Sequence, residues 1–302
     1  MADDLLIEQS FRLTYQQTVG VVAQQLTSKF RQFVTEKTGS GYATAASDLV
    51  GKVKAVTRTT KDRRNLENSA SIARRWLMMR DEFESGDYID DEDVLRQVIS
   101  PQSEIMRGHL GAVQRRVDEI IIGLDDDGVV GNGGLIGTVV EGKTPSTTVA
   151  FPSSQVIAAG GTGLTMAKLK AVREQFAKAD YDLDTESPVM AIDPTEMTDL
   201  LGIVEAAGSS INLAEQAQMT DGKVKRFMNM NFLETNRLPL NGTTRDCIAW
   251  MPSNIVLGVW KDVTGDIWKD THANNTPYAQ VEARMDCTRK EDSGVIKVEC
   301  AE

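Results

Sequence analysis

One segment of the chain has the spacing of a phosphate-binding loop. Residues 137–144 read GTVVEGKT and satisfy the pattern GxxxxGK[ST]. In such a loop the backbone N–H groups wrap the phosphates, the lysine reaches the outer phosphates and the last hydroxyl holds magnesium. A functional loop leads directly into a helix, but here Pro145 follows at once and STTVAFP shows no helical period. A P-loop nucleotide-binding protein that uses Gly137–Thr144 is therefore the alternative function, not the favoured one.

The residues that most often bind metals or act as nucleophiles are few and widely spaced. Cys247, Cys287 and Cys300 fit neither a disulfide framework nor a CxxC zinc pattern. His109 and His272 are the only histidines, which excludes a His-rich metal site and leaves few candidates for a catalytic triad. We therefore expect no enzyme activity and no catalytic, cofactor or metal site.

An acidic turn at residues 125–128, DDDG, suggests a calcium loop but does not fit one. In an EF-hand loop that starts at Asp125, the fifth and sixth positions should be a ligand and a glycine. They are Val129 and Val130. We interpret this cluster as the turn that ends a helix.

Two oppositely charged segments lie close together in the first third of the chain. Residues 52–64 read KVKAVTRTTKDRR, and residues 81–93 read DEFESGDYIDDED, with eight acids and no base. Complementary patches steer association and fix its register, although both segments could also be simply solvated. The candidate contact residues between subunits are the bases Lys52, Lys54, Arg58, Lys61, Arg63 and Arg64 and the acids Glu84, Asp87, Asp90 and Asp91.

The composition narrows the class of protein. The 302 residues are 41% hydrophobic and 25% charged, which is ordinary for a globular chain with one large or two ordinary domains. The net charge of −11 argues against nucleic-acid binding by the whole chain. No apolar run reaches the roughly 18 residues of a membrane span, and MADDLLIEQS lacks the pattern of a secretory signal. We expect a protein that folds in a cytosol.

The charged segments are flanked by a predicted arm, a hinge and a hairpin. Apolar residues recur at three- and four-residue steps over 10–34, which predicts an amphipathic helix. A hinge at 38–47, TGSGYATAAS, follows it. Residues 48–75 predict an exposed β-hairpin with its tip near Lys61 to Asn65. Because an isolated hairpin is marginal in water, we expect it to lie on another surface.

A long helix is predicted after the acidic segment. Ser100 is its N-cap and Pro101 its first residue, and it ends before the acidic turn at 125–128. Over 101–124 it would span roughly 36 Å at about 1.5 Å per residue. Its buried stripe comprises Ile105, His109, Val113, Val117, Ile120, Ile121 and Leu124.

The remaining pattern predicts helices and strands in irregular order. A helix is expected over 165–179, a buried strand over 189–192 and a helix after the capping box Asp193–Glu196. At the C-terminus, alternation over 281–288 and a return at 295–300 predict an antiparallel hairpin with one solvated face. The order lacks a regular βαβ alternation, so the fold class is α+β.

Six segments in this order resemble the major capsid proteins of tailed bacteriophages with the Hong Kong 97-like fold. The six segments are residues 50–64, 88–124, the pair 164–180 and 189–201, 231–239, 249–263 and 278–300. The segment 88–124 matches positions that the family fills alike at Tyr88, Asp90, Asp93, Pro101, Arg116 and Asp118. Elsewhere the chain departs from the family, because relatives often carry Gly where Asn229 stands.

The resemblance implies a domain organisation. It comprises an N-terminal arm (1–40), an extended loop formed by a β-hairpin (41–75), a peripheral domain (76–160) with a spine helix (101–124), an axial domain (161–264) and terminal strands (265–302) that return to the peripheral domain. A tail tube or decoration component is a further alternative, which the long helix disfavours.

The resemblance also implies the function and the partners. It predicts a virion structural protein whose pentamers and hexamers self-assemble into the icosahedral head shell around double-stranded DNA, without sequence-specific binding. The partners would be further copies of the chain, a scaffolding protein, a portal and a decoration protein, with no cofactor and no membrane. Assembly is expected in the cytoplasm of the bacterial host.

Overall fold

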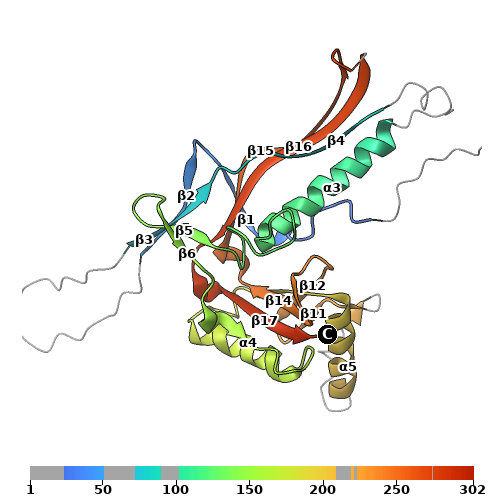
Figure 1. The fold of residues 1–302 in the computed structure, drawn as a ribbon. Helices are drawn as coiled ribbons and strands as arrows, with labels where there is room; N and C mark the ends of the chain where they lie inside the picture. The colour runs from blue at the N-terminus through green and yellow to red at the C-terminus, as the bar shows by residue number, and fades with distance from the viewer. Residues whose placement is uncertain (1–23, 51–71, 90–101, 209–218, 221–222, 274) are drawn as a thin grey trace, which may run out of the picture.

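The computed structural model describes the chain except for residues 1–23, 51–71, 90–101, 209–218, 221–222 and 274 (Figure 1). The molecule is elongated, with a compact lower part around helices α4 and α5 and a long β-hairpin that rises from it. Helices and strands are mixed without βαβ repetition, which confirms the α+β class. No described helix is long and apolar enough to cross a membrane.

A seven-stranded sheet, here named the core sheet, forms the compact part. Its order is β11-β12-β8-β14-β17-β7, with β13 paired to β14. Strand β14 runs antiparallel to both of its neighbours in this order, β8 and β17. The strands are β7 (Val156–Ile157), β8 (Val189–Ile192), β11 (Arg226–Phe227), β12 (Met230–Glu234), β13 (Leu240–Asn241), β14 (Thr244–Trp250) and β17 (Val295–Ala301).

Helices α4 (Met166–Lys178) and α5 (Pro194–Gly208) pack their apolar residues into the same core as these strands. The Thr165 side chain caps α4 by accepting a hydrogen bond from the Lys168 N–H at 3.4 Å. All four residues of β8 are buried, as expected for a strand covered on both faces. The predictions of α4, β8 and α5 are confirmed.

A four-stranded sheet, here named the outer sheet, carries the long hairpin. Its order is β1-β15-β16-β4. Helix α3 (Gln102–Ile122) lies along it, as Figure 1 shows. Glycine at position 123 ends the helix in a left-handed conformation (φ +98°), two residues before the expected turn. The strands are β1 (Thr35–Thr38), β4 (Phe83–Tyr88), β15 (Ile255–Asp270) and β16 (Thr276–Arg289).

A smaller sheet of order β2-β3-β5-β6 lies beside the outer sheet. Strands β2 (Ala43–Val50) and β3 (Ile72–Met78) pair antiparallel and form the base of the predicted hairpin. Its tip, Lys61 to Asn65, lies outside the described residues. The other elements are β5 (Val139–Glu141), β6 (Thr147–Val149), β9 (Met219–Thr220), β10 (Lys223–Val224) and the 3₁₀ turns η1 (Arg31–Phe33), η2 (Ser153–Gln155), η3 (Pro252–Asn254) and η4 (Asp292–Gly294).

The prediction of an N-terminal helix over residues 10–34 is wrong for the part of this range that the structure describes. Residues 10–23 lie outside the described part, and residues 24–34 contain only the turn η1 instead of an α-helix. The fully buried Phe30 stacks on Trp250 with ring centroids 5.5 Å apart, so tertiary contacts replace helical ones. The expected hinge at 38–47 is also partly wrong, because β2 begins at Ala43 and pairs with β3.

The predicted C-terminal hairpin is wrong as well. Strand β16 pairs with β15 and β4, whereas β17 pairs with β14 and β7. The turn η4 therefore carries the chain from the outer sheet into the core sheet, and β17 does not return to the part that contains α3. Val295 and Ile296 are adjacent and both fully buried, so this strand needs cover on both faces, which a hairpin with a solvated face cannot give.

Candidate subunit-contact surface

Most of the charged residues predicted to contact other subunits lie outside the described part of the chain. The structure therefore does not place them relative to one another. The two acids that are described, Glu84 and Asp87, both lie on β4. The undescribed residues are Lys52, Lys54, Arg58, Lys61, Arg63, Arg64, Asp90 and Asp91.

Strand β4 turns its two candidate acids to opposite faces of the outer sheet. Glu84 and Asp87 are three residues apart in a strand paired regularly with β16, and side chains alternate along a strand. Ser85 hydrogen-bonds the His109 Nδ1 atom of α3 at 2.8 Å, so Asp87 lies on the helix side and Glu84 on the other side. A partner that approaches one face meets only one of the two acids.

The face of β15, β16 and β4 that carries Glu84, here named the outward face, bears a row of aromatic rings near its distal end. Trp268, Tyr278 and Tyr88 are opposite one another in the register. Their ring centroids are 5.3 Å apart for the first pair and 4.7 Å for the second. Trp268 is 42% exposed and Tyr88 is 49% exposed. This is a large apolar surface to leave in water.

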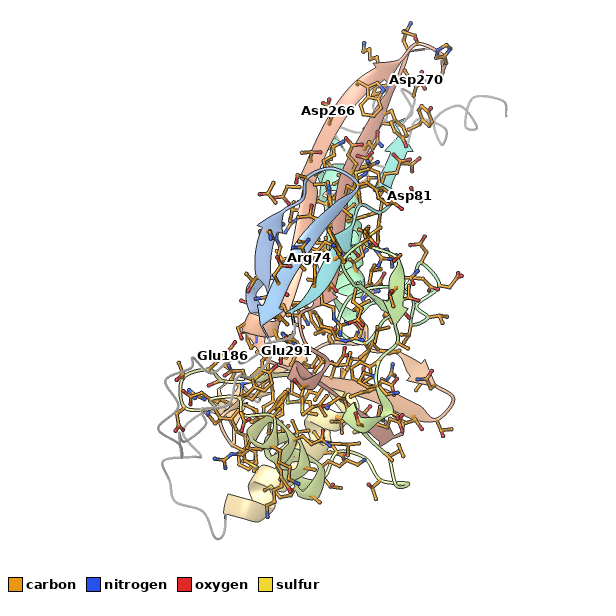
Figure 2. The ribbon with its side chains drawn as sticks, turned by 90° about the vertical axis from the view of Figure 1, so that its left-hand side faces the viewer. Arg74, Asp81, Glu186, Asp266, Asp270 and Glu291 are labelled. Atoms are coloured by element: carbon orange, nitrogen blue, oxygen red, sulfur yellow. The ribbon has the colours of Figure 1, made fainter. Side chains whose placement is uncertain are left out.

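The row of aromatic rings has an acid, Asp270, at its distal end. The Tyr88 hydroxyl donates a hydrogen bond to Asp270 at 2.8 Å. This bond raises the pKa of Tyr88 and lowers the pKa of Asp270, because it favours the protonated phenol and the charged carboxylate. Figure 2 shows Asp266 and Asp270 on the upper part of the hairpin.

Next to the aromatic row, the outward face carries acids without an ion-pair partner. Glu84 and Asp266 are exposed, and neither forms a salt bridge with any described residue. Toward the base of the hairpin the acids are instead neutralised within the chain. Lys261 binds Glu82 at 2.7 Å and also Glu282, and its hydrogen bond lowers the pKa of Glu82. The outward face is therefore acidic and aromatic at its distal half.

Sequence reasoning missed most of this surface. Asp266 and Trp268 come from β15, which is about 180 residues from β4 in the chain but belongs to the same sheet. The alternation in β15 could have shown that the two side chains share a face. Only the register shows that they share it with Glu84.

The N-terminal segment is attached to α3 by one buried acid. Asp118 is fully buried and accepts hydrogen bonds from Ser28 Oγ at 2.5 Å and from the backbone N–H groups of Lys29 and Phe30 at 3.1 and 3.2 Å. Gln25 donates a further bond at 2.5 Å. A carboxylate that satisfies several donors fixes the path of this segment across the helix.

The segment 137–144 does not have the geometry of a phosphate-binding loop. Residues 139–141 form β5, Gly142 has φ +112°, and the chain continues into β6 instead of a helix. The Gly142 carbonyl is occupied by Trp76 Nε1 at 2.9 Å. The segment is a β-hairpin turn, and no helix N-terminus is present to bind a nucleotide phosphate.

Away from this surface, the described residues include side chains that could hold a metal. Glu196, Cys247 and Cys300 place their ligand atoms within 4.8 Å of one another in the core sheet region, and Asp193, Glu196 and Glu302 do the same. Both sets contain residues of the C-terminal strand or tail.

Comparison with known proteins follows the fold. The family model of the phage capsid protein matches residues 7–302. Similar solved structures include the capsid of the cyanophage P-SCSP1u, with a TM-score of 0.71, 16% identity and coverage of 98% of this chain and 94% of that one. The Mycobacterium phage Adephagia structure has a TM-score of 0.67 and 13% identity, and the match covers 99% of this chain and 97% of that one. The capsid of a native GTA particle has a TM-score of 0.66 and 11% identity, and the match covers 100% of both chains. No curated protein matches the chain by sequence.

Proposed function

The chain belongs to the phage capsid protein family, and from this we infer how its copies meet in the shell. It is a major capsid protein with the Hong Kong 97-like fold, a structural component of the virion and not an enzyme. Its copies associate with one another to form the shell. The match of the family model to residues 7–302 carries this conclusion.

The assembly itself is proposed from the family. The subunits form pentamers and hexamers that close into an icosahedral shell around double-stranded DNA in the cytoplasm of the bacterial host. A scaffolding protein, a portal and a decoration protein are the further partners. The net charge of −11 disfavours binding of the packaged DNA by the chain as a whole, because both are acidic.

The domain organisation is also proposed. The N-terminal arm, extended loop, peripheral domain and axial domain keep the boundaries 1–40, 41–75, 76–160 and 161–264. Two separate sheets support a division between a peripheral part around α3 and an axial part around α4 and α5, but they do not follow the boundaries at 160 and 264, because β7 belongs to the core sheet and β15 to the outer sheet. The terminal strands, 265–302, contribute β16 to the first part and β17 to the second.

For the contact between subunits, we propose that the basic segment 52–64 of one copy lies on the outward face of a neighbour. The acids Glu84 and Asp266, which form no ion pair with the described residues, supply opposite charge, and the row of Tyr88, Tyr278 and Trp268 supplies aromatic faces for guanidinium groups. Each exposed ion pair contributes only about 0–1 kcal/mol. The pairs repeat at every subunit contact, so they are sufficient to fix register.

The experiment reverses the charges of the basic segment. We expect Arg63→Glu/Arg64→Glu to slow shell assembly at low salt, measured by sedimentation and by electron microscopy of the fast fraction. The control is Lys170→Glu/Arg173→Glu, the same charge change at exposed positions of α4. Assembly of the first variant as efficient as that of the parent at low salt would contradict charge steering.

A rescue variant separates steering from general repulsion. Adding Glu84→Arg and Asp266→Arg to the reversed segment restores attraction only if these two acids face it. We expect recovery of most of the lost assembly rate, and the recovery should weaken as salt screens the pairs. If the assembly rate does not recover while the parent forms shells normally, the basic segment contacts another surface.

A further inference from the structure

Two cysteines that are far apart in the sequence are neighbours in the core sheet. Cys247 lies on β14 and Cys300 on β17, and both are buried free cysteines. The register pairs Arg245 with Cys300 and Cys247 with Val298, so both thiols are on the same face as diagonal neighbours. Glu196, the third residue of α5, completes a cluster whose Sγ and carboxylate oxygen atoms are within 4.8 Å of one another.

The carboxylate of Glu196 has no hydrogen-bond donor among the described residues. Glu196 is 1% exposed, and neither of its oxygens accepts a hydrogen bond from the described residues. It occupies the capping-box position of α5 but makes no capping bond. Burial raises the pKa of Glu196. A buried carboxylate without donors is strongly unfavourable unless it gains a proton or a cation.

The two thiols lie within 4.8 Å of each other and affect each other's titration. The hydrogen bond between them lowers the pKa of Cys300 and, together with burial, raises the pKa of Cys247. The charge of Lys168, whose Nζ atom donates to the carbonyls of Thr162, Gly163 and Glu299, also lowers the pKa of Cys300. Metals bind the thiolate form of cysteine, so binding of an ion between these two side chains would release their protons.

We propose that Glu196, Cys247 and Cys300 bind one zinc ion. Two thiolates and a carboxylate select a borderline-soft metal over calcium or magnesium, which take oxygen ligands. Zn–S bonds of about 2.3 Å and Zn–O bonds of about 2.1 Å in a tetrahedron place the ligand atoms about 3.5–3.8 Å apart. The observed cluster, with all atoms within 4.8 Å, needs only small side-chain shifts to reach this geometry.

A fourth position can be filled from the same place. Asp193 precedes α5, is 6% exposed, and its Oδ1 atom accepts no hydrogen bond from the described residues. Carboxylate oxygens of Asp193 and Glu302 lie within 4.8 Å of one of Glu196, in a set that does not include the two cysteines. A water, or Asp193 after a side-chain shift, completes the tetrahedron. Arg245, 3.9 Å from Asp193, offsets the net negative charge of two thiolates and a carboxylate around a divalent ion.

The ion would tie together three elements that no single stretch of sequence holds. Its ligands come from the first turn of α5, from β14 and from β17, the last strand of the chain. A disulfide between Cys247 and Cys300 would explain the approach of the thiols but would leave Glu196 without a partner. The proposal concerns the axial part of the subunit and does not depend on how subunits contact one another.

The test begins with the unaltered full-length chain, purified under reducing conditions with zinc present and then gel-filtered. We expect about one zinc per chain by elemental analysis, in free subunits and in shells alike. Replacement by Co²⁺ should give the near-ultraviolet charge-transfer band of cobalt bound to thiolate. Absence of both metal and band would overturn the proposal, as would a Cys247–Cys300 disulfide as the main species in intact-mass measurement.

Variants then assign the ligands. Cys300→Ser should reduce the zinc content at least tenfold, and Glu196→Gln should weaken zinc affinity by about tenfold or more. The matched control is Cys287→Ser, a fully buried cysteine in β16 that is not part of the cluster and should keep the metal. Circular dichroism establishes that each variant is folded. A folded Cys300→Ser chain with full zinc content, or unchanged affinity in Glu196→Gln, contradicts the assigned ligand set.

Discussion

The core sheet and the outer sheet differ in how completely the chain covers them. In the core sheet, β8 and most of β14 are buried on both faces, and α4 and α5 pack their apolar residues into the same core. In the outer sheet, β15 is buried over residues 255–258 but exposed over most of its distal half. The same strand thus begins in a core and ends on a surface, as the long hairpin in Figure 1 shows.

This difference separates what one subunit needs to fold from what it offers to others. The core sheet buries its apolar side chains within the chain, and its fully buried Trp250 donates from Nε1 to a backbone carbonyl at 3.1 Å. The outer sheet leaves exposed aromatic rings at its distal end, beside acids that form no ion pair within the described part of the chain. A shell protein gains by this arrangement, since surfaces left open by one copy are available to the next.

The largest expected effect comes from removing one tryptophan from each sheet, which tests the difference between the two sheets directly. Trp250→Ala removes a fully buried ring stacked on Phe30 and should lower the free energy of unfolding by about 3–5 kcal/mol. Trp268→Ala removes a ring that is 42% exposed and should cost less than about 1 kcal/mol in free subunits while reducing assembly. Urea unfolding and sedimentation measure the two effects. Equal losses of stability would remove the distinction.

The connection between the N-terminal segment and α3 is the next test. Asp118→Ala leaves the N–H groups of Lys29 and Phe30 without their acceptor and should lower the free energy of unfolding by about 2–3 kcal/mol. Limited proteolysis should then cut faster near residues 24–30. The control, Asp126→Ala, removes an acid whose side chain is 90% exposed and should change stability little. Protection of this segment equal to that of the parent would show that Asp118 does not hold it.

A smaller effect is expected at the edge of the core sheet. Asn229 adopts φ +64° in the turn between β11 and β12, where relatives of the resembled family often carry glycine. Asn229→Ala should lower the free energy of unfolding by about 1–2 kcal/mol, because an ordinary L-residue is strained there and the bond from Ser187 Oγ is lost. Asn229→Gly should lose less, since it relieves the strain. A glycine variant as unstable as the alanine variant would show that the side-chain bonds dominate.

The smallest effect is a difference in pH dependence between two aspartates. Burial raises the pKa of Asp246 in β14 above 3.8, so its contribution to stability falls as pH rises from 3.8 through that raised pKa. The hydrogen bond from Arg31 lowers the pKa of Asp262 in β15, so its contribution is present above 3.8 and is lost as pH falls through the lowered pKa. Asp246→Asn should reduce the loss of unfolding free energy as pH rises, and Asp262→Asn should reduce its loss as pH falls. Denaturant unfolding between about pH 3 and pH 7 tests both signs; unchanged slopes would contradict them.

Local patterns predicted the elements whose signals are complete within a short window. The stripe of Leu169, Val172 and Phe176 recurs at the helical period, and all three are buried in α4. The run at 189–192 is a buried strand, and α3 occupies nearly the predicted range. These features depend on the spacing of apolar residues, which the sequence displays directly.

Other predictions were wrong because a pattern shows that a face is buried but not what buries it. The apolar steps over residues 10–34, which include Phe30, suggested a helix, yet this ring packs on Trp250 and the backbone is held by Asp118. The alternation at the C-terminus gave two strands correctly but paired them with each other, although they belong to different sheets. Strand partners far apart in sequence are chosen by packing, which local spacing does not encode.

The candidate sites follow the same division. The acids of β4 were visible as a charged segment, but their separation onto opposite faces depends on the pairing with β16. The wide spacing of Cys247 and Cys300 suggested no metal site, whereas the register of β14 and β17 brings them together beside Glu196.

By itself the sequence determined most of the helical and extended segments, the α+β class, the concentration of charge near the start and the resemblance to a capsid protein. Only the tertiary structure decided which strands share a sheet, which faces stay open on the long hairpin and which distant side chains meet. The physical reason is that side-chain periodicity is a property of a few consecutive residues. The choice of partner is made by the free energy of burying surfaces that the whole chain brings together.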